Sequence, residues 1–202
     1  MFVNKDGLME EIRDHFEHVD TCPVQGKRIF FENAGGALTL KSVVERSTEL
    51  ASIPDNQGRD NPASHELVRL INQAKEDIRT FLGAAKGPVF VGESGTELLF
   101  RLISTAIIEA PEGGNVVGST LEHPASVSAC ARWSRIARRE FIRVPHNDET
   151  GSVTAEDYRP YITADTRVAT ILHTSPVTGM AVDVASIAKL IREVSPDAKI
   201  GR

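Results

Sequence analysis

Two short turns in this chain carry residue types that can bind an anion and an aromatic ring. The first, Ser94-Gly95-Thr96-Glu97, opens a predicted helix and offers free backbone N–H groups, a glycine for close approach and a hydroxyl, which suit a phosphate. The second, Glu122-His123-Pro124, places an imidazole at a helix start, where a flat ring can lie against it. Because both turns follow predicted strands, and ligands of α/β sheets bind at the carboxyl ends of strands, we expect the turns to share one site.

Each turn also has a purely structural explanation. Ser94 fits a capping box with Glu97, so helix capping accounts for the first turn as well as phosphate binding does. His123 is predicted to be a helix N-cap, because Pro124 suits the first helical position. Ser, Thr, Asp or Asn would cap more favourably, by about 0.5–2 kcal/mol. A histidine at this position therefore favours a functional role over a turn that happens to contain it.

A third polar loop, residues 173–179, follows the next apolar strand and is expected to close another side of the same pocket. Other kinds of site find no support in the sequence. The spacings of a Walker loop, of G-x-G-x-x-G and of the G-x-S-x-G elbow are absent, which disfavours nucleotide triphosphate chemistry and a serine hydrolase. The His and Cys residues match no accepted zinc spacing, so no metal site is expected.

The elements that must position these turns alternate between strands and helices. The run Val168 to Leu172 is apolar without polar alternation, which is typical of a parallel sheet covered on both faces. The expected strands are 89–91, 115–117, 141–144 and 168–173, with a further strand opening near 199–200, and the expected helices are 96–108, 125–138, 155–160 and 184–194. This order predicts an α/β fold with a mostly parallel sheet.

Helices also dominate the prediction for the first eighty residues. Apolar spacing predicts a short helix from Leu8 to Phe16 and longer ones over 40–53 and from Ser64 to Phe81, the last capped by Ser64 and closed by Gly83. Residues 28–31 are predicted to form a short strand that leads into a glycine-rich loop. The polar segment 55–62 is predicted to be a loop, because it could not build a core.

The bulk composition is that of an ordinary globular protein. A formal charge of −5 over 202 residues argues against a nucleic-acid surface, and the cluster of Arg132, Arg135, Arg138 and Arg139 around Trp133 is interpreted as the solvated face of a helix. No stretch approaches the ~20 apolar residues that cross a bilayer, so no membrane partner is expected. Two cysteines and a start without an apolar leader favour the reduced cytoplasm.

Taken together and in order, several segments resemble the first half of the large domain of fold-type I pyridoxal-phosphate enzymes. The resemblance is to the class V aminotransferase group, which includes cysteine desulfurases. The segments that carry it are Ile29-Phe-Phe-Glu-Asn-Ala-Gly-Gly36, Asn61-Pro-Ala-Ser-His65, Phe90-Val-Gly-Glu-Ser-Gly-Thr-Glu97, the E-H-x-A-like run Glu122-His123-Pro124-Ala125, and Asp165-Thr-Arg-Val168 leading to His173 and Gly179. The fold that this resemblance implies is the three-layer α/β large domain with a mostly parallel sheet, incomplete at the C-terminus.

The resemblance implies pyridoxal 5′-phosphate as the cofactor and an amino acid as the substrate. His123 would stack on the pyridine ring and take part in catalysis. The other cofactor contacts would come from Ser94, Gly95, Thr96 and Ser175, and the substrate contacts from Asn33, Ala34 and Gly35. The full-length protein would be a homodimer.

Two departures qualify what carries over from the family. Pro176 stands where the family commonly has an Asn that faces the cofactor, and proline cannot donate that hydrogen bond, although Ser175 or Thr178 could substitute. The family's ring-nitrogen Asp, Schiff-base Lys, nucleophilic Cys and carboxylate-binding Arg are expected beyond residue 202. The chain is therefore expected to be an N-terminal portion that is inactive alone, and Cys130, on a helix, is not expected to be a nucleophile.

The domain organisation expected from the sequence is an N-terminal segment over 1–60 followed by a partial cofactor-binding large domain over 61–202. Two other functions stay open at this point. One is a non-catalytic module of the same fold that binds a phosphorylated ligand. The other is an enzyme of a different α/β type that uses His123 together with Glu122 or Glu93.

Overall fold

The computed structural model describes residues 6–31, 33, 35–54 and 57–201. Contacts within the chain group it into two compact units, Met1–Val89 and Phe90–Arg202. The domain division expected at residues 60 and 61 remains a prediction. Each unit is described by itself below.

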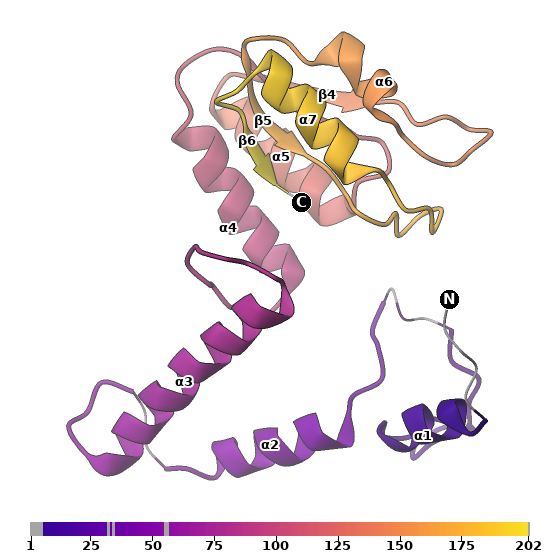
Figure 1. Cartoon of the computed structure of the whole chain (residues 1–202), viewed down its shortest axis with the longest axis vertical. Helices are drawn as coiled ribbons and strands as arrows, with labels where there is room; N and C mark the ends of the chain where they lie inside the picture. The colour runs from indigo at the N-terminus through magenta and orange to yellow at the C-terminus, as the bar shows by residue number, and fades with distance from the viewer. Residues whose placement is uncertain (1–5, 32, 34, 55–56, 202) are drawn as a thin grey trace. The chain divides into compact units, whose positions relative to one another are not determined.

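A four-stranded parallel sheet forms the centre of the second unit (Figure 1). Its strands, in the spatial order β4-β3-β5-β6, are β3 (Asn115–Ser119), β4 (Glu140–Val144), β5 (Thr166–Thr170) and β6 (Lys199–Gly201). All three pairings are parallel, with Val117 opposite Ile142 on one side and Ala169 on the other. The parallel sheet expected from the apolar strands is confirmed, and so is the strand that opens near residue 199.

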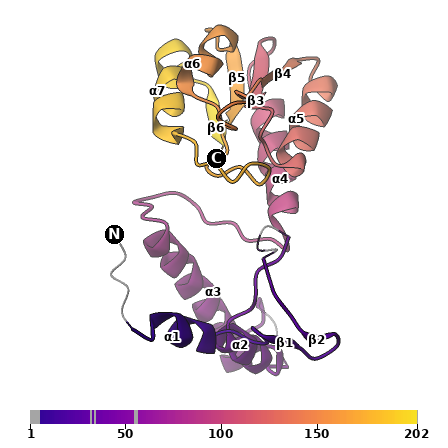
Figure 2. The same cartoon turned by 90° about the vertical axis from the view of Figure 1, so that its right-hand side faces the viewer.

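Helices cover both faces of this sheet, which gives three layers (Figure 2). The helices α4 (Gly95–Ile108) and α5 (Pro124–Ile136) lie on one face, and α6 (Ala155–Tyr158), a following turn of 3-10 helix (Arg159–Tyr161) and α7 (Val184–Val194) lie on the other. Ile107 and Cys130 are buried between α4, α5 and the sheet. Tyr158 and Ile187 are buried against the opposite face. The apolar stripes of these helices therefore face the sheet, as their 3.6-residue spacing requires.

One member of the predicted arginine cluster is part of the core instead of a solvated face. Arg139 is 9% exposed, and its guanidinium donates to the carbonyl oxygens of Ala110 and Pro111 at 2.8 Å and to that of Gly113. These hydrogen bonds hold the loop between α4 and β3 against the segment that follows α5, and they give the buried guanidinium its acceptors. Arg132 keeps the predicted surface role and lies over the ring of Trp133, 5.8 Å from its centroid.

The first unit contains three helices and a two-stranded hairpin among its described residues. These are α1 (Leu8–Asp14), β1 (Thr21–Cys22), β2 (Gly26–Lys27), α2 (Lys41–Ala51) and α3 (Pro62–Phe81). The cap predicted for the long helix was wrong: Asn61 is the N-cap and accepts a hydrogen bond from the backbone of Ser64 at 2.9 Å, with Pro62 at the first helical position. An Asn followed by Pro is an equally favourable start, and it lengthens the helix by two residues.

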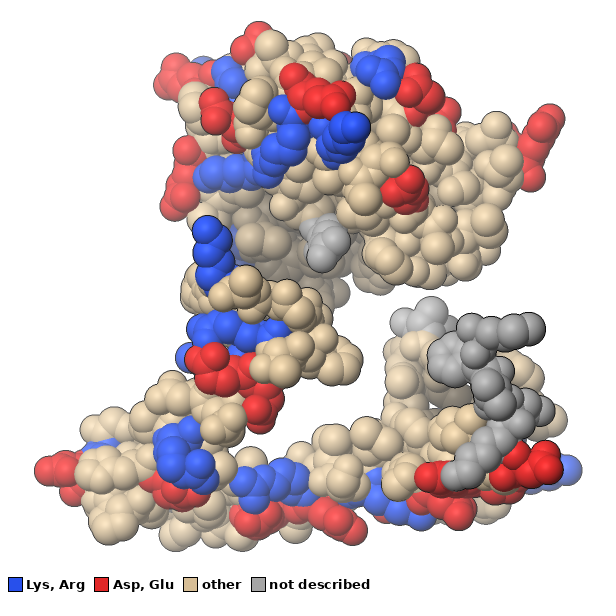
Figure 3. Space-filling model, in the orientation of Figure 1, with Lys and Arg blue, Asp and Glu red and all other residues tan. Residues whose placement is uncertain are grey.

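Acidic and basic side chains are interspersed over α2 and α3 on the face shown in Figure 3. Arg46 pairs with Glu49 at 2.5 Å and Arg69 with Glu66 at 2.7 Å, each one turn apart on its helix. Mixed charge of this kind offers no field for a polyanion, which agrees with the negative net charge. No helix among the described residues is long and apolar enough to cross a bilayer.

Two predicted strands are absent from the structure. Residues 28–31 and 89–91 have neither regular structure nor a bridge partner among the described residues, although both runs are rich in β-favouring side chains. Phe31 is 90% exposed and Phe90 is 79% exposed, so neither run packs as a strand does. A strand depends on its neighbours, and β-propensity without a paired edge does not produce one.

Candidate functional site

The turn after β3 holds His123 in a defined position. His123 is the N-cap of α5, and its Nδ1 accepts a hydrogen bond from the backbone N–H of Ala125 at 3.1 Å. Because Nδ1 is an acceptor, the neutral ring carries its proton on Nε2. The residue itself is exposed. The predicted N-cap is confirmed, and it fixes one edge of an imidazole whose faces remain accessible to a ligand.

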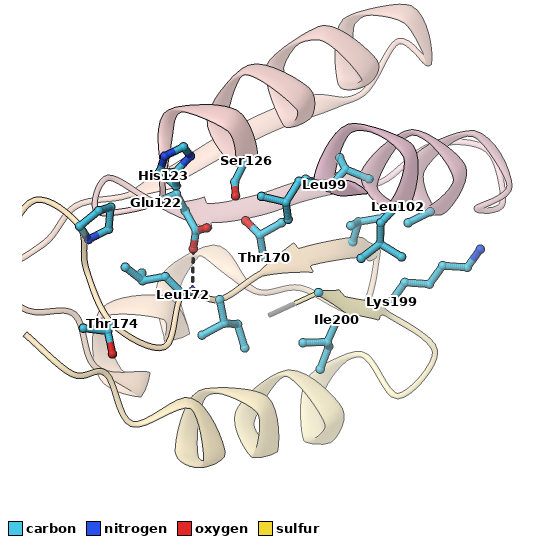
Figure 4. Close-up of a pocket in the computed structure, with 16 residues that line it drawn as sticks. Leu99, Leu102, Glu122, His123, Ser126, Thr170, Leu172, Thr174, Lys199 and Ile200 are labelled. Atoms are coloured by element: carbon cyan, nitrogen blue, oxygen red, sulfur yellow. Dashed lines mark hydrogen bonds between the residues drawn. The ribbon is translucent and has the colours of Figure 1, made fainter. Parts of the chain in front are cut away.

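Glu122, the residue before His123, points in the opposite direction, into the protein. Its side chain is 6% exposed, and Oε1 accepts from the backbone N–H of Leu172 at 2.9 Å (Figure 4). Burial raises the pKa of this carboxyl to about 7, although hydrogen bonds from Leu172 and from the side chain of Ser126 act against the rise. Glu122 entered the sequence analysis as part of a motif and as one possible acidic partner of His123, but its burial is a feature of the fold.

A cavity of about 310 Å³ extends from this turn, past the carboxyl end of β5, along α4 and the strands β5 and β6 (Figure 4). Most of its wall is apolar, and it is contributed by α4, by the residues that follow β5 and by β6. Its polar lining groups are Glu122, His123, Ser126, Thr170, Thr174 and Lys199. An apolar cleft with a few convergent polar groups at the end of parallel strands is the usual form of a small-molecule site.

The turn predicted to hold a phosphate forms the start of α4, as expected. Ser94 is the N-cap and accepts from the backbone N–H of Glu97 at 3.2 Å, while the Glu97 carboxylate turns back to accept from the N–H of Glu93 at 3.0 Å. The N–H groups of Gly95 and Thr96 have no acceptor within the helix, because its first turn leaves them free. Gly95 and Thr96 are both exposed, and a Cβ atom at Gly95 would meet no atom within 4 Å.

This turn starts the helix that lines the cavity, but the turn itself is not part of the cavity wall. Leu99 and Leu102 line the cavity, and Leu99 follows Gly95 by four residues, about one helical turn. Ser94, Gly95 and Thr96 themselves are not among the lining residues. Their assignment to a phosphate stays a prediction that rests on the free amides of exposed residues.

The third predicted loop contributes neighbours of Ser175 to the cavity. Thr174 and Pro176 line it, whereas Ser175 is buried and its hydroxyl accepts from the backbone N–H groups of Val177 at 3.1 Å and Thr178 at 3.2 Å. Ser175 thus caps its own turn, and its O–H remains able to donate. The predicted cofactor contact of Ser175 is untested, and Thr174 is a cavity residue that the sequence analysis did not single out.

The predicted substrate contacts belong to the first unit. Asn33 lines a hollow of about 590 Å³ there, together with Phe16 and Phe30, and Gly35 lies in the loop that follows. Ala34 is outside the described residues. These three assignments remain predictions.

The buried Cys130 is not placed to act as a nucleophile, and the described residues form no cluster of metal ligands. Burial raises the pKa of the Cys130 thiol to about 12, so it stays protonated at neutral pH and is a poor nucleophile. Among the residues that the structure describes, no three His, Cys, Asp or Glu side chains converge as metal ligands.

Comparisons with known proteins agree with the architecture and with the motifs. A sequence profile of one protein family, Aminotransferase class-V, matches residues 29–199. A cysteine desulfurase-like protein, ustD, of Aspergillus flavus is 28% identical over 199 residues, covering 92% of this chain. The apo structure of a cysteine desulfurase from Thermococcus onnurineus NA1 superposes with a TM-score of 0.79 at 18% identity over 99% of this chain.

A further structural neighbour carries the cofactor named by the resemblance. A variant of C-DES with glycine covalently linked to the PLP cofactor superposes with a TM-score of 0.73 at 14% identity, over 93% of this chain. The chain spans 42% of the length of ustD and 47% of each of the two structures. The likeness in structure establishes the fold, which is the fold-type I α/β architecture expected from the sequence.

Proposed function

Because the chain belongs to the Aminotransferase class-V family, we propose that it forms the N-terminal portion of a pyridoxal-phosphate-dependent enzyme that acts on an amino acid, with cysteine desulfurase-like chemistry as the leading assignment. The observation that carries the proposal is the cavity that reaches the carboxyl end of β5, with His123 in its wall. A fold of this type hosts its ligands at that edge.

The residues present fit the cofactor. Pyridoxal phosphate combines a planar pyridine ring with a phosphate, and the second unit offers a partner for each part. The free N–H groups at the start of α4 belong to exposed residues, Gly95 and Thr96, at the end of the helix where its dipole favours an anion. The imidazole of His123 is exposed and held by its Nδ1 edge, so a flat ring can pack on its face.

The bound cofactor supplies an electron sink for bonds at the substrate's α-carbon. The residues of this chain have simpler tasks. The first turn of α4 binds the phosphate and fixes its distance from the sheet, and His123 orients the ring and holds a proton at Nε2. The apolar wall, which includes Leu99, Leu102 and Ile200, excludes water from one side of the cavity.

We further propose that residues 1–202 hold the cofactor without covalent attachment, in a cytoplasmic protein that is a homodimer at full length. Neither lysine of the second unit has a free amine directed at His123. Lys189 pairs with Glu193 at 3.9 Å on α7, and Lys199 pairs with Glu109 at 3.7 Å, with its ammonium group at the opposite end of the cavity from Glu122 (Figure 4).

Equilibrium titration of the chain with pyridoxal phosphate, followed by its visible absorbance, tests the proposal. His123→Ala should weaken binding two- to tenfold, because an aromatic contact contributes about 0.5–1.5 kcal/mol. His65→Ala, which removes an exposed histidine from α3, is the matched control and should bind as the parent chain does. Pyridoxal, which lacks the phosphate, should bind much more weakly.

Borohydride treatment and mass spectrometry complete the experiment. The proposal of non-covalent binding expects no pyridoxyl mass on any lysine. A parent chain that does not bind the cofactor, or that binds pyridoxal as tightly as pyridoxal phosphate, would contradict the proposed function.

A further inference from the structure

Glu122 is a buried acid that the proposed chemistry does not yet use. It has two hydrogen-bond donors, the backbone N–H of Leu172 and the side chain of Ser126, and no ion pair to it is found among the described residues. Burying an ionisable group without a cation is costly, so such a residue is kept for a reason other than stability.

The geometry of the sheet explains why an acceptor is needed at this point. Ile171 donates its N–H to Gly201 on the β6 side at 2.9 Å. Because successive residues of a strand face opposite neighbours, the N–H of Leu172 faces the β3 side. There β3 has already ended at Ser119, and the carboxylate of Glu122 takes the place of the missing backbone acceptor.

Gly118 in β3 lies beside Thr170 and Glu122. A Cβ atom at Gly118 would lie 2.5 Å from Oγ1 of Thr170, which is a clash, and 3.6 Å from Cγ of Glu122, which is an ordinary contact. The glycine therefore makes room for Thr170, a cavity residue next to the buried acid.

Through its two hydrogen bonds Glu122 joins three elements around His123. Its backbone belongs to the turn after β3, Ser126 lies in the first turn of α5, and Leu172 lies just beyond β5, two residues before the cavity residue Thr174. His123 is the next residue in the chain and caps the same helix. The hydrogen bonds of Glu122 therefore hold the backbone from which the imidazole of His123 projects.

The titratable groups that face Glu122 give its charge no compensation. Cys130 on α5 and Tyr158 on α6 both have their pKa raised by burial and further by the charge of Glu122, so both are neutral at neutral pH. His123 lies beside it on the turn, and Lys199 across the cavity is paired with Glu109. The carboxyl, whose own pKa is about 7, therefore changes charge in the physiological range.

We propose that Glu122 is a positioning residue of the cofactor site: its carboxyl group locks the turn that bears His123 to the end of β5, and ionisation of Glu122 loosens that lock. The proposal rests on the proposed function for the ligand, but the lock itself is a property of the unliganded chain. Its consequence is that the imidazole is held most firmly below neutral pH, because a buried carboxylate without a cation gains hydration when the lock opens.

The test compares Glu122→Gln, Glu122→Leu and the parent chain. Gln keeps an acceptor for Leu172 but cannot titrate, whereas Leu removes the acceptor. Glu140→Gln, an exposed acid in β4 of the same unit, is the matched control. Amide hydrogen exchange of Leu172 should be slow in the parent and in Glu122→Gln and at least tenfold faster in Glu122→Leu. In the parent chain the protection factor of Leu172, which is corrected for the pH dependence of intrinsic exchange, should fall as the pH rises from 6 to 8, with no such change in Glu122→Gln.

A second readout follows the hydrogen bond itself. The backbone amide NMR signal of Leu172, which donates to Glu122, should show an inflection near pH 7 in the parent chain that Glu122→Gln abolishes and Glu140→Gln keeps. Unchanged Leu172 exchange in Glu122→Leu, or identical Leu172 titration curves in the parent and Glu122→Gln, would overturn the proposal. If Glu122→Leu does not fold, the parent and Glu122→Gln still decide it.

Cofactor binding separates this inference from the proposed function. Pyridoxal phosphate should bind about tenfold more weakly to Glu122→Leu than to the parent at pH 6. If the parent binds no cofactor while the exchange and NMR results appear as expected, the lock stands and the proposed function fails. If the parent binds and Glu122→Leu changes none of the three readouts, the inference fails alone.

Discussion

A negative charge placed at the start of α4 should selectively weaken binding of a phosphorylated ligand. Gly95 is the place for it, because a side chain there meets no atom within 4 Å and the residue occupies an ordinary helical conformation. Gly95→Asp adds the charge, and Gly95→Asn adds a side chain of the same shape without it. An acidic residue in the first turn favours the helix dipole by about 0.3–1 kcal/mol, so Gly95→Asp should fold at least as stably as the parent.

The size of the effect follows from Coulomb's law. Two like charges 4 Å apart repel by about 1 kcal/mol in water and about 4 kcal/mol at an effective dielectric constant of 20. The turn is exposed and the phosphate carries nearly two charges, so a loss of about 1.4–2.8 kcal/mol is reasonable, which corresponds to roughly 10- to 100-fold in Kd.

Isothermal titration of Gly95→Asp and Gly95→Asn with pyridoxal phosphate measures this difference. Gly95→Asn should bind within about threefold of the parent, and raising the ionic strength should narrow the gap between the two variants. Equal affinity of Gly95→Asp and Gly95→Asn at low salt would refute the assignment of the phosphate to this turn.

Three further predictions concern the second unit and the cysteines. The pKa of Glu122 is higher in the folded chain than the usual value of 4.5, so the folded state binds more protons than the unfolded state. The free energy of unfolding should therefore fall as the pH rises from about 4.5 to 7. Urea titrations over this pH range should show the fall in the parent chain and a smaller fall in Glu122→Gln. Gly118→Ala should cost about 1–3 kcal/mol by overpacking against Thr170, and adding Thr170→Ala should recover part of that loss in the same assay. Ellman's reagent should modify Cys22, whose pKa is lowered by backbone hydrogen bonds from Gln25 and Val24, and should reach the buried Cys130 only after unfolding; rapid reaction of both thiols in the native chain would contradict the structure.

Patterns that depend on local sequence were predictable. The caps at Ser94, His123 and Thr154 are formed by residues next to the helices they start, and the structure has all three. The central strands β3 and β5 were predictable from continuous apolar runs, which only a sheet covered on both faces can bury.

Features that depend on distant neighbours could not be predicted. Residues 28–31 and 89–91 have the composition of strands, but pairing decides whether a strand forms, and no single sequence states its partner. Arg139 resembled a surface residue because it follows a basic helix. Its guanidinium nevertheless donates hydrogen bonds to carbonyl groups that lie 26 to 29 residues away in the chain. The burial of Glu122 and its hydrogen bond to Leu172 could not be predicted for the same reason, since Leu172 lies 50 residues along the chain.

NMR spectra of the labelled chain during titration with pyridoxal phosphate test the central claim most directly. In the proposed site, main-chain amides at the start of α4 bind the phosphate while the imidazole of His123 stacks on the pyridine ring. The N–H signals of Gly95 and Thr96 and the ring signals of His123 should then shift together, with one common affinity. Shifts confined to one of the two groups, or to neither, would contradict the account.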